Sequence, residues 1–527
     1  ERVLLSDSHM VYIYPKTQEL IMKKNRDFSF DGIINAGNFE IFGNQHEFSY
    51  DNFKFDSPNI DSIRIYVNTK VIDEFGRKKT TRLKTVIVDV KGELLIDSPG
   101  NKSGLKSLHK FPKFNSLKES YAYYDKKAVQ GGVYNRDNFS FQLEPFELDS
   151  LDNFKNQGLN FEGTFESAGI FPVFNETLSI QPDYSLGFVR PTPPEGFDVY
   201  NGKGKFYNEI KLSNEGLKGD GYLEYLTSTT ESKDLNFHPD SMFGIGENYV
   251  IEEQMDNVQY PPVSGNDVFV KWLPIKDYMK VYTKEKPLSF YDGESKFYGS
   301  IKYNPKELRG AGKYEFQEAT LYSRDYLFKF MEFDSDTADF ILESLEDNLL
   351  TFNTTNVNAH VDFKERKALF ISNAGSTIIN LPENQYIAKI DRFTWFMDSK
   401  EIELSGGEVS EEASKKDLSL EGSKFTSVHP DQDSLSFYSS AATFDYNNKI
   451  IKARNVKLFL VGDSYFYPDS GKLIVRIKAN MDPLKNAVIV ANTVTEYHRI
   501  YDVSVKVKGR LEYKGEGNID YIDQDNQ

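Results

Sequence analysis

Lys205-Phe206-Tyr207-Asn208-Glu209-Ile210-Lys211 returns 91 positions later as Lys296-Phe297-Tyr298-Gly299-Ser300-Ile301-Lys302. The correspondence continues without a gap for about thirty residues. Identical residues at this offset are Leu217, Gly219, Gly221, Glu224, Ser232, Asp234 and Phe237, which return as Leu308, Gly310, Gly312, Glu315, Ser323, Asp325 and Phe328. Such self-similarity predicts a repeat architecture, in which each unit buries its apolar face against the next.

The composition favours strands and disfavours anionic partners. The 527 residues include 32 Tyr and 41 Phe but only two Trp, and aromatic residues suit the pleated, half-buried surface of a sheet. The formal net charge of −17 repels nucleic-acid backbones and anionic membranes, so we expect no nucleic-acid partner.

Cysteine is absent, which excludes disulfides, zinc–thiolate sites and thiol catalysis. No apolar run approaches the ~18 residues that a membrane-spanning helix needs. The sequence begins at Glu1 with neither an initiator Met nor a signal-like segment, so we expect that processing or truncation has removed residues before it.

Alternation of apolar and polar residues dominates the chain and predicts strands at 63–67, 85–90, 472–477 and 503–507. Two segments have weak helical periodicity, namely 337–350 and 116–124. Irregular stretches at 98–132, 190–194 and 405–430 predict boundaries near residues 100, 195 and 410. The resulting division is a β-repeat unit at 1–100, a β unit with a basic insertion at 101–195, the duplicated region at 196–410 and a hairpin array at 411–527.

The sequence contains no strong catalytic or metal-binding motif. HExxH, GxSxG and P-loop patterns are absent. His429, Asp431 and Asp433 form one polar group, which is interpreted as a loop before a strand. Asp334, Asp336 and Asp339 lack the Gly and the closing Glu of a calcium loop. We therefore expect no catalytic residue, no metal and no cofactor, and we expect Trp272 and Trp395 to pack in the core.

A surface signal recurs five times: Asp, then Ser or Thr, then an aliphatic residue or Met. It resembles the O-glycosylation acceptor that Bacteroidota use on exported proteins, and composition alone would give roughly two such triplets. The predicted acceptors are Ser62, Ser150, Ser241, Thr337 and Ser434.

Several longer sequence segments resemble parts of large Bacteroidota cell-envelope β-repeat proteins, a family whose function is uncharacterised. These segments are 212–221 with 226–229, 355–363 and 120–125. The resemblance implies an exported, periplasmic or outer-membrane-associated location. A weaker resemblance, at Ala442 to Ala453, is to the strand–turn–strand unit of OstA- and AsmA-type β-taco proteins, which move lipopolysaccharide and other lipids.

These observations predict an elongated all-β repeat array, either a β-solenoid or stacked sheets, with tandem β-sandwiches as the alternative. The leading functional hypothesis is a non-enzymatic structural or assembly scaffold of a bacterial cell envelope, whose partners are other envelope proteins.

Two alternative functions remain. The first is a lipid or glycolipid conduit along an apolar β-groove, with a candidate lining of Phe444, Tyr446, Ile450, Leu458, Leu460, Tyr465 and Tyr467. The other interpretation of these side chains is that they fill the core. The second alternative is a glycan-binding or glycan-cleaving protein, which would need exposed aromatic residues beside a pair of carboxylates.

Overall fold

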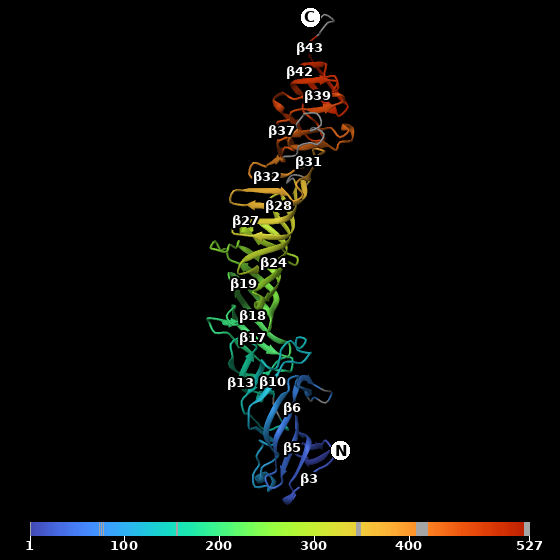
Figure 1. Cartoon of the computed structure of the whole chain (residues 1–527). Helices are drawn as coiled ribbons and strands as arrows, with labels where there is room; N and C mark the ends of the chain where they lie inside the picture. The colour runs from blue at the N-terminus through green and yellow to red at the C-terminus, as the bar shows by residue number, and fades with distance from the viewer. Residues whose placement is uncertain are drawn as a thin grey trace. The chain divides into compact units, whose positions relative to one another are not determined.

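A computed structural model describes residues 2–72, 74, 76, 78–153, 156–343, 349–406 and 420–520. These residues form 43 strands, one four-residue helix and six short 3₁₀ turns, and the strands pair antiparallel throughout (Figure 1). The all-β array is therefore confirmed. No helix in the described ranges is long and apolar enough to cross a membrane.

The chain divides into two compact units. Unit 1 comprises 1–247 and 269–277, and unit 2 comprises 248–268 and 278–527. Strands β20 (Ser241–Ile251) and β21 (Val263–Leu273) have residues in both units. The four-part division at residues 100, 195 and 410 remains a prediction, and position 410 itself is outside the described residues.

Unit 1 is a meander, in which most strands pair with their neighbours along the chain. Its strands are β1 (Val3–Ser6), β2 (Val11–Pro15), β3 (Ile21–Met22), β4 (Phe28–Ala36), β5 (Phe39–Ser49), β6 (Lys54–Ile72), β7 (Lys78–Arg82), β8 (Ile87–Leu95), β9 (Lys113–Ser116), β10 (Ser120–Tyr123), β11 (Phe139–Leu143), β12 (Glu147–Leu148), β13 (Phe161–Ser167), β14 (Phe174–Ile180), β15 (Leu186–Pro191), β16 (Phe197–Val199), β17 (Gly204–Ser213), β18 (Gly216–Tyr225) and β19 (Ser228–His238). The single helix, α1 (Pro99–Lys102), lies in the basic stretch.

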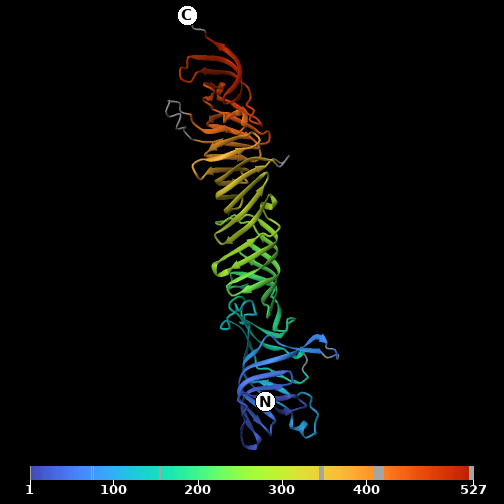
Figure 2. The ribbon, with the colours of Figure 1, turned by 90° about the vertical axis from the view of Figure 1, so that its right-hand side faces the viewer.

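Unit 2 continues the same pattern with β22 (Tyr278–Tyr282), β23 (Leu288–Phe290), β24 (Ser295–Asn304), β25 (Glu307–Phe316), β26 (Ala319–Phe328), β27 (Glu332–Glu343), β28 (Leu350–Asp362), β29 (Lys367–Ser372), β30 (Thr377–Leu381), β31 (Tyr386–Ile390), β32 (Arg392–Phe396), β33 (Glu401–Ser405), β34 (Ser423–Ser427), β35 (Ser436–Ser439), β36 (Ala441–Asp445), β37 (Ile450–Arg454), β38 (Phe459–Val461), β39 (Ser464–Tyr467), β40 (Leu473–Val475), β41 (Leu484–Ala491), β42 (His498–Gly509) and β43 (Glu512–Ile519). Figure 2 shows these strands as successive rungs within the unit.

The sequence repeat is also a structural repeat, and it is longer than the matching residues indicate. β15 to β19 in unit 1 correspond to β22 to β26 in unit 2 at the same offset of 91. In both copies a threonine outside the matched stretch binds the middle of the long strand. Thr192 Oγ1 accepts from the Asn208 amide at 3.0 Å, and Thr283 Oγ1 accepts from the Gly299 amide at 2.8 Å.

Two buried tyrosines confirm this extension of the repeat. The Tyr200 hydroxyl lies 2.9 Å from the carbonyl oxygens of both His238 and Ser241. The Tyr291 hydroxyl lies 3.1 Å and 3.0 Å from the carbonyl oxygens of Lys329 and Glu332, which are the equivalent positions. Each tyrosine therefore ties the turn after a short strand, β16 or β23, to the turn that follows β19 or β26.

The long strands of the repeat bend at glycines. Gly221 and Gly312 have φ angles of +153° and +151°, and a Cβ atom there would lie 1.9 Å and 2.1 Å from the carbonyl oxygens of Tyr207 and Tyr298. The register shifts beside both glycines, as at a β-bulge. Different short strands pair with the two halves of each long strand: β15 and β16 with β17, and β22 and β23 with β24. The sheet is thus folded along a line of bulges.

Beyond β28, pairs of short strands replace the bent long strands. Successive hairpins alternate between two sheets. The β29 sheet contains β29, β32, β33, β36, β37 and β40 in that order. The β30 sheet contains β30, β31, β34, β35, β38, β39, β41, β42 and β43. β28 pairs with the first strand of each sheet.

The described parts of both weakly helical segments contain strands and no helix, so those helix predictions are wrong there, and residues 344–348 of the first segment lie outside the described residues. Residues 337–343 belong to β27, and 116–124 contains the end of β9 and all of β10. In β27 the register shifts between Ser335 and Ala338 and again before Phe340. These irregularities interrupt the two-residue alternation, which gave the segment a helical spacing of apolar residues.

Candidate functional site

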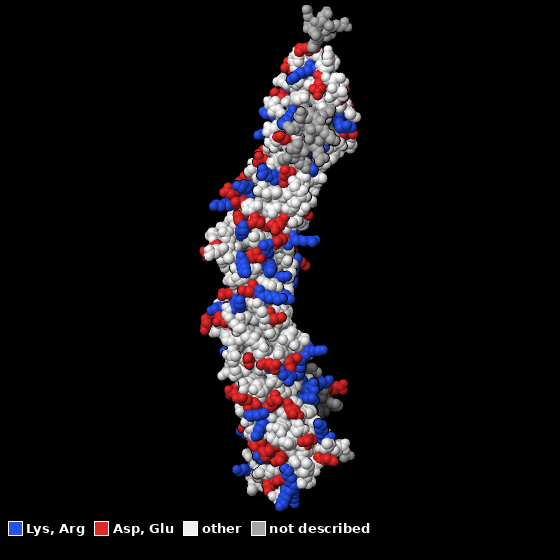
Figure 3. Space-filling model, viewed as in Figure 1, with Lys and Arg blue, Asp and Glu red and all other residues white. Residues whose placement is uncertain are grey.

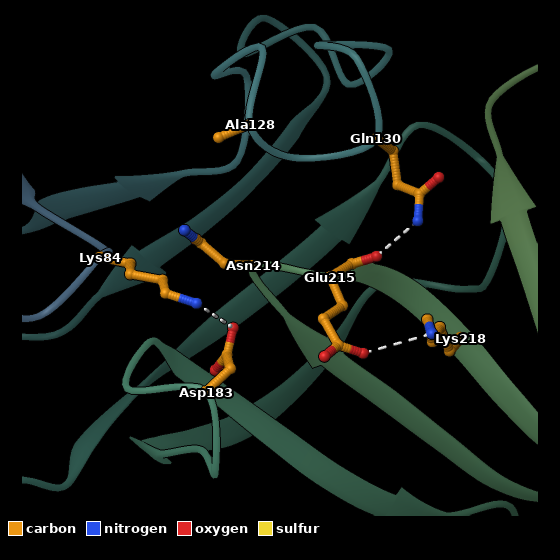
Figure 4. A pocket seen from close by; sticks show the side chains of 7 residues that line it. All are labelled: Lys84, Ala128, Gln130, Asp183, Asn214, Glu215 and Lys218. Carbon is orange, nitrogen blue, oxygen red and sulfur yellow. Dashed lines mark hydrogen bonds and ion pairs between the residues drawn. The ribbon is translucent and has the colours of Figure 1, made fainter.

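A polar cleft of about 400 Å³ lies in unit 1 (Figure 4). The side chains around it come from the segment between β7 and β8, the loop after β10, the β14–β15 turn, the β17–β18 turn and strand β18. Lys84 Nζ lies 3.7 Å from Asp183, and Lys218 Nζ lies 3.3 Å from Glu215. Gln130 Nε2 donates to the Glu215 carbonyl oxygen at 2.7 Å. Because each charge is paired within the cleft, the arrangement holds loops together and resembles no nucleophile–base pair.

A pair of surface hollows lies at equivalent positions of the two repeat copies, one in unit 1 and one in unit 2. In unit 1 the hollow lies beside Ser232, Lys233 and Asp234, and its volume is about 290 Å³. In unit 2 the equivalent residues Ser323, Arg324 and Asp325 line a hollow of about 750 Å³. The larger volume accompanies the register shift in β27, where Asp336 and Thr337 turn to solvent. The pair of hollows is thus a consequence of the bulges in the folded sheet.

One group of potential metal ligands stands out among the described residues. Glu332 on β27 and Asp362 on β28 are directly opposite each other across the two strands. Their carboxylate oxygens and a ring nitrogen of His360 all lie within 4.8 Å of one another. The sequence analysis predicted no metal site and missed this group, because Glu332 is 28 positions from His360 and only strand pairing joins them.

His360 is oriented by a further carboxylate. His360 Nδ1 lies 2.6 Å from Asp334 Oδ1, and these two residues also form a cross-strand pair. Lys329 Nζ contacts Glu332 at 2.7 Å and Asp334 at 2.9 Å. Burial opposes the charge of Asp334, but the hydrogen bonds from His360 and Lys329 outweigh it and lower the pKa of this carboxyl below its usual value. Asp334 is therefore ionised at neutral pH and holds the imidazole in place.

The polar groups that the sequence singled out each have separate partners and do not converge. His429 Nδ1 accepts from the Asp431 amide at 3.1 Å, as the cap of a 3₁₀ turn. Asp433 binds Arg510 through a 2.5 Å contact instead of facing the imidazole. Asp334, Asp336 and Asp339 do not converge on one point. Asp334 faces His360, whereas Asp339 accepts from the Asn356 amide.

Both tryptophans and most of the candidate conduit lining are buried. Trp272 and Trp395 have no exposed surface, which confirms the prediction that they pack in the core. Phe444, Tyr446, Leu458 and Tyr465 are also buried, whereas Ile450 and Tyr467 are partly exposed and Leu460 points to solvent.

The five predicted O-glycosylation acceptors differ in accessibility. Thr337 and Ser434 are exposed, and Ser62 and Ser150 are partly exposed. Ser241 is buried, and its hydroxyl donates to Asp240 at 2.8 Å. Modification at any of them remains a prediction. If glycosylation takes place on the folded protein, Thr337 and Ser434 are the most accessible of the five acceptors.

The outer surface carries interleaved charges of both signs (Figure 3). Many belong to cross-strand ion pairs, such as Arg309 with Asp325 at 2.7 Å and Lys452 with Glu401 at 3.2 Å. In unit 1 the pair that corresponds to Arg309–Asp325 is Lys218–Asp234 at 3.1 Å. Comparison of the chain with protein-family models and with curated protein sequences finds no match.

Proposed function

We propose that this chain is a non-enzymatic structural or assembly scaffold of a bacterial cell envelope, in contact with other envelope proteins. The assignment to the envelope rests on the sequence resemblance. The scaffold role rests on one structural observation: in unit 2 the space between the β29 sheet and the β30 sheet is occupied by buried aromatic side chains.

Aromatic rings meet across that space. Phe352 on β28 lies 5.1 Å from Phe393 on β32, measured between ring centroids, and 6.4 Å from Phe444 on β36. All three rings are buried, as are Phe425 and Phe437 on the opposite sheet. Buried rings in contact with one another occupy the space that an acyl chain would need, so lipid could enter only if the sheets separated. With its apolar side chains buried inside, unit 2 has its polar side chains and strand edges on the outside for binding.

The outer surfaces suit protein partners. Cross-strand ion pairs cover the strand faces, and the edge strand β43 is exposed along its whole length and pairs only with β42 among the described residues. An unpaired edge offers backbone donors and acceptors to a strand of another protein. Association through such an edge needs no pocket and no catalytic group.

A lipid or glycolipid conduit is the second candidate, and the folded sheet is the observation that favours it. The segment with β-taco resemblance, Ala442 to Ala453, forms the β36–β37 hairpin, and consecutive hairpins face each other across the apolar interior. For this function the two sheets would have to part and expose Phe352 and Phe393 to the lipid.

Native mass spectrometry of the full chain, gently extracted from its host membranes, separates the two candidates. The scaffold predicts protein subunits at a fixed ratio and no lipid that survives detergent exchange. Retained lipid at a fixed ratio, without protein subunits, would refute the scaffold and support the conduit.

A pair of variants tests whether the edge strand is used. Ile519→Lys places a charge on β43, where the side chain is 52% exposed. The matched control, Leu460→Lys, alters a 48% exposed side chain on β38, which is paired on both sides. We expect Ile519→Lys to reduce subunit binding and Leu460→Lys to leave it unchanged. Equal binding by both variants would refute association through this edge.

A further inference from the structure

We propose that Glu332, His360 and Asp362 form a binding site for a divalent transition-metal ion, with Zn²⁺ as the ion that fits best. The three side chains project from two adjacent strands of unit 2, and their ligand atoms lie within 4.8 Å of one another. One imidazole nitrogen and two carboxylate oxygens are a common set of protein ligands for zinc, with water in the remaining position.

The surroundings of the imidazole support the same assignment. A histidine that binds a metal through one nitrogen commonly donates from the other to a carboxylate, which fixes the ring. Here Nδ1 of His360 is held by Asp334 at 2.6 Å, so Nε2 is the nitrogen left for a metal. Because the ring is already oriented before an ion arrives, binding costs less conformational entropy than it would for a mobile side chain.

His9 shows that the arrangement around His360 differs from an ordinary histidine among acids. His9 also has two carboxylates nearby: Asp152 lies 2.9 Å from Nδ1, and Asp97 lies 3.7 Å from Nε2. These carboxylates flank the ring on its two different nitrogens, so they do not share one nitrogen and cannot converge on one ion. At His360, by contrast, one carboxylate orients the ring and two others lie close to a ring nitrogen.

Lys329 is the internal competitor of the ion. Its ammonium group contacts Glu332 and Asp334 and partly neutralises the carboxylates. The Lys329 side chain is about one-third exposed, so its flexible stem can swing into solvent when an ion binds. We therefore expect moderate affinity, with a dissociation constant in the micromolar range, and tighter binding when the lysine charge is removed.

Cations that prefer oxygen ligands alone, such as Ca²⁺, fit this group of side chains less well than Zn²⁺ does. Ca²⁺ takes six to eight oxygen ligands, whereas this site offers two carboxylates and a nitrogen. Zinc should consequently bind far more tightly than calcium. The ion would join β27 to β28 just after the turn that Tyr291 holds, and so it should also stabilise that hairpin.

The test is isothermal titration of the EDTA-treated, dialysed full chain with ZnCl₂ at neutral pH. Wild type should bind one Zn²⁺ at this site, with little heat from CaCl₂. His360→Gln and Glu332→Gln should each abolish that binding step, and Asp334→Asn should weaken it by about tenfold through loss of the orienting carboxylate. Lys329→Gln should strengthen it several-fold.

The matched control is His9→Gln, which removes an imidazole that also lies between two aspartates and should leave the zinc isotherm unchanged. Circular dichroism checks that each variant keeps its strand content. Zinc binding that is the same in wild type and His360→Gln, or that is lost in His9→Gln instead, would overturn the proposal. An equal response to zinc and calcium would identify only diffuse attraction to an acidic protein and would overturn it as well.

Discussion

Replacement of either buried tyrosine by phenylalanine should loosen one defined turn in one unit. Tyr200→Phe removes the hydroxyl that lies 2.9 Å from the carbonyl oxygens of His238 and Ser241, and Tyr291→Phe removes its counterpart at Lys329 and Glu332. The phenyl ring keeps the packing of the original side chain, so the loss is confined to the hydrogen bonds.

The expected cost follows from the burial of the hydroxyl. Tyr200 and Tyr291 are both largely buried, and burial raises the pKa of each phenol well above its usual value. Loss of a buried hydroxyl that leaves carbonyl acceptors without their donor costs about 1–2 kcal/mol. This is a five- to thirtyfold increase in the population of the locally opened state.

Hydrogen exchange measured by mass spectrometry on peptides from the two turns tests this prediction. Tyr200→Phe should speed exchange in 228–241 and leave 319–332 unchanged, and Tyr291→Phe should do the reverse. The double variant should show both effects independently, because the sites are in separate units and share no partner. Equal exchange in wild type and both variants would refute the role given to the tyrosines. Acceleration of both peptides by one substitution would refute the view of the repeats as independent units.

Three further substitutions or conditions have defined outcomes. Gly312→Ala should destabilise unit 2 strongly because the new Cβ would meet the Tyr298 carbonyl oxygen, whereas Gly375→Ala, at a positive φ in open space, should cost only about 1 kcal/mol; urea unfolding that gives equal costs would contradict this. Phe393→Ala should cost about 3–5 kcal/mol in the same assay because it empties the middle of the interior between the sheets, and a cost below 1 kcal/mol would show that the interior is loosely packed. Burial lowers the pKa of His46 to about 4 from 6.5, so the unfolded chain binds the proton more tightly, and the stability of unit 1 should fall by up to about 3 kcal/mol as the pH drops from 6.5 to 4. His46→Gln should flatten that part of the pH profile, and an unchanged slope in the variant would contradict the assignment.

Most of the fold was predictable from residue patterns, but the details that give it shape were not. The strand alternation and the Lys205 and Lys296 repeats predicted an all-β array, and this is confirmed because a period of two residues directly reflects which face of a strand is buried. At 337–343 the alternation did not predict a strand, because bulges in β27 shift the two-residue pattern. The hydrogen bonds of Tyr200 and Tyr291 to the distant turns were not predicted, because the stretches around the two tyrosines share few identical residues. The two tyrosines themselves lie at the repeat offset of 91, so this signal could have been detected in the sequence.

The candidate metal site was not predictable, for a different reason. Its members are separated along the chain, and only the register of β27 against β28 places Glu332 opposite Asp362 and Asp334 opposite His360. A shift of the register by one residue would send these side chains to opposite faces of the sheet. The register of β27 against β28 shifts three times between Ser335 and Glu343, so no count of residues in the sequence gives the pairing at Glu332 and Asp334.

The alternation of hairpins between the two sheets has a consequence for how unit 2 is made. Each new hairpin after β28 needs only strands that precede it closely, as when β34 joins β31 or β36 joins β33. Contacts of short sequence separation close quickly, so the chain can fold in the order of its synthesis and need not wait for its C-terminal part. At every stage the newest strand is an open edge, which the next hairpin covers. A ribosome that pauses within this region would therefore expose a strand ready to pair with a neighbouring nascent chain, so steady translation should protect the protein from aggregation.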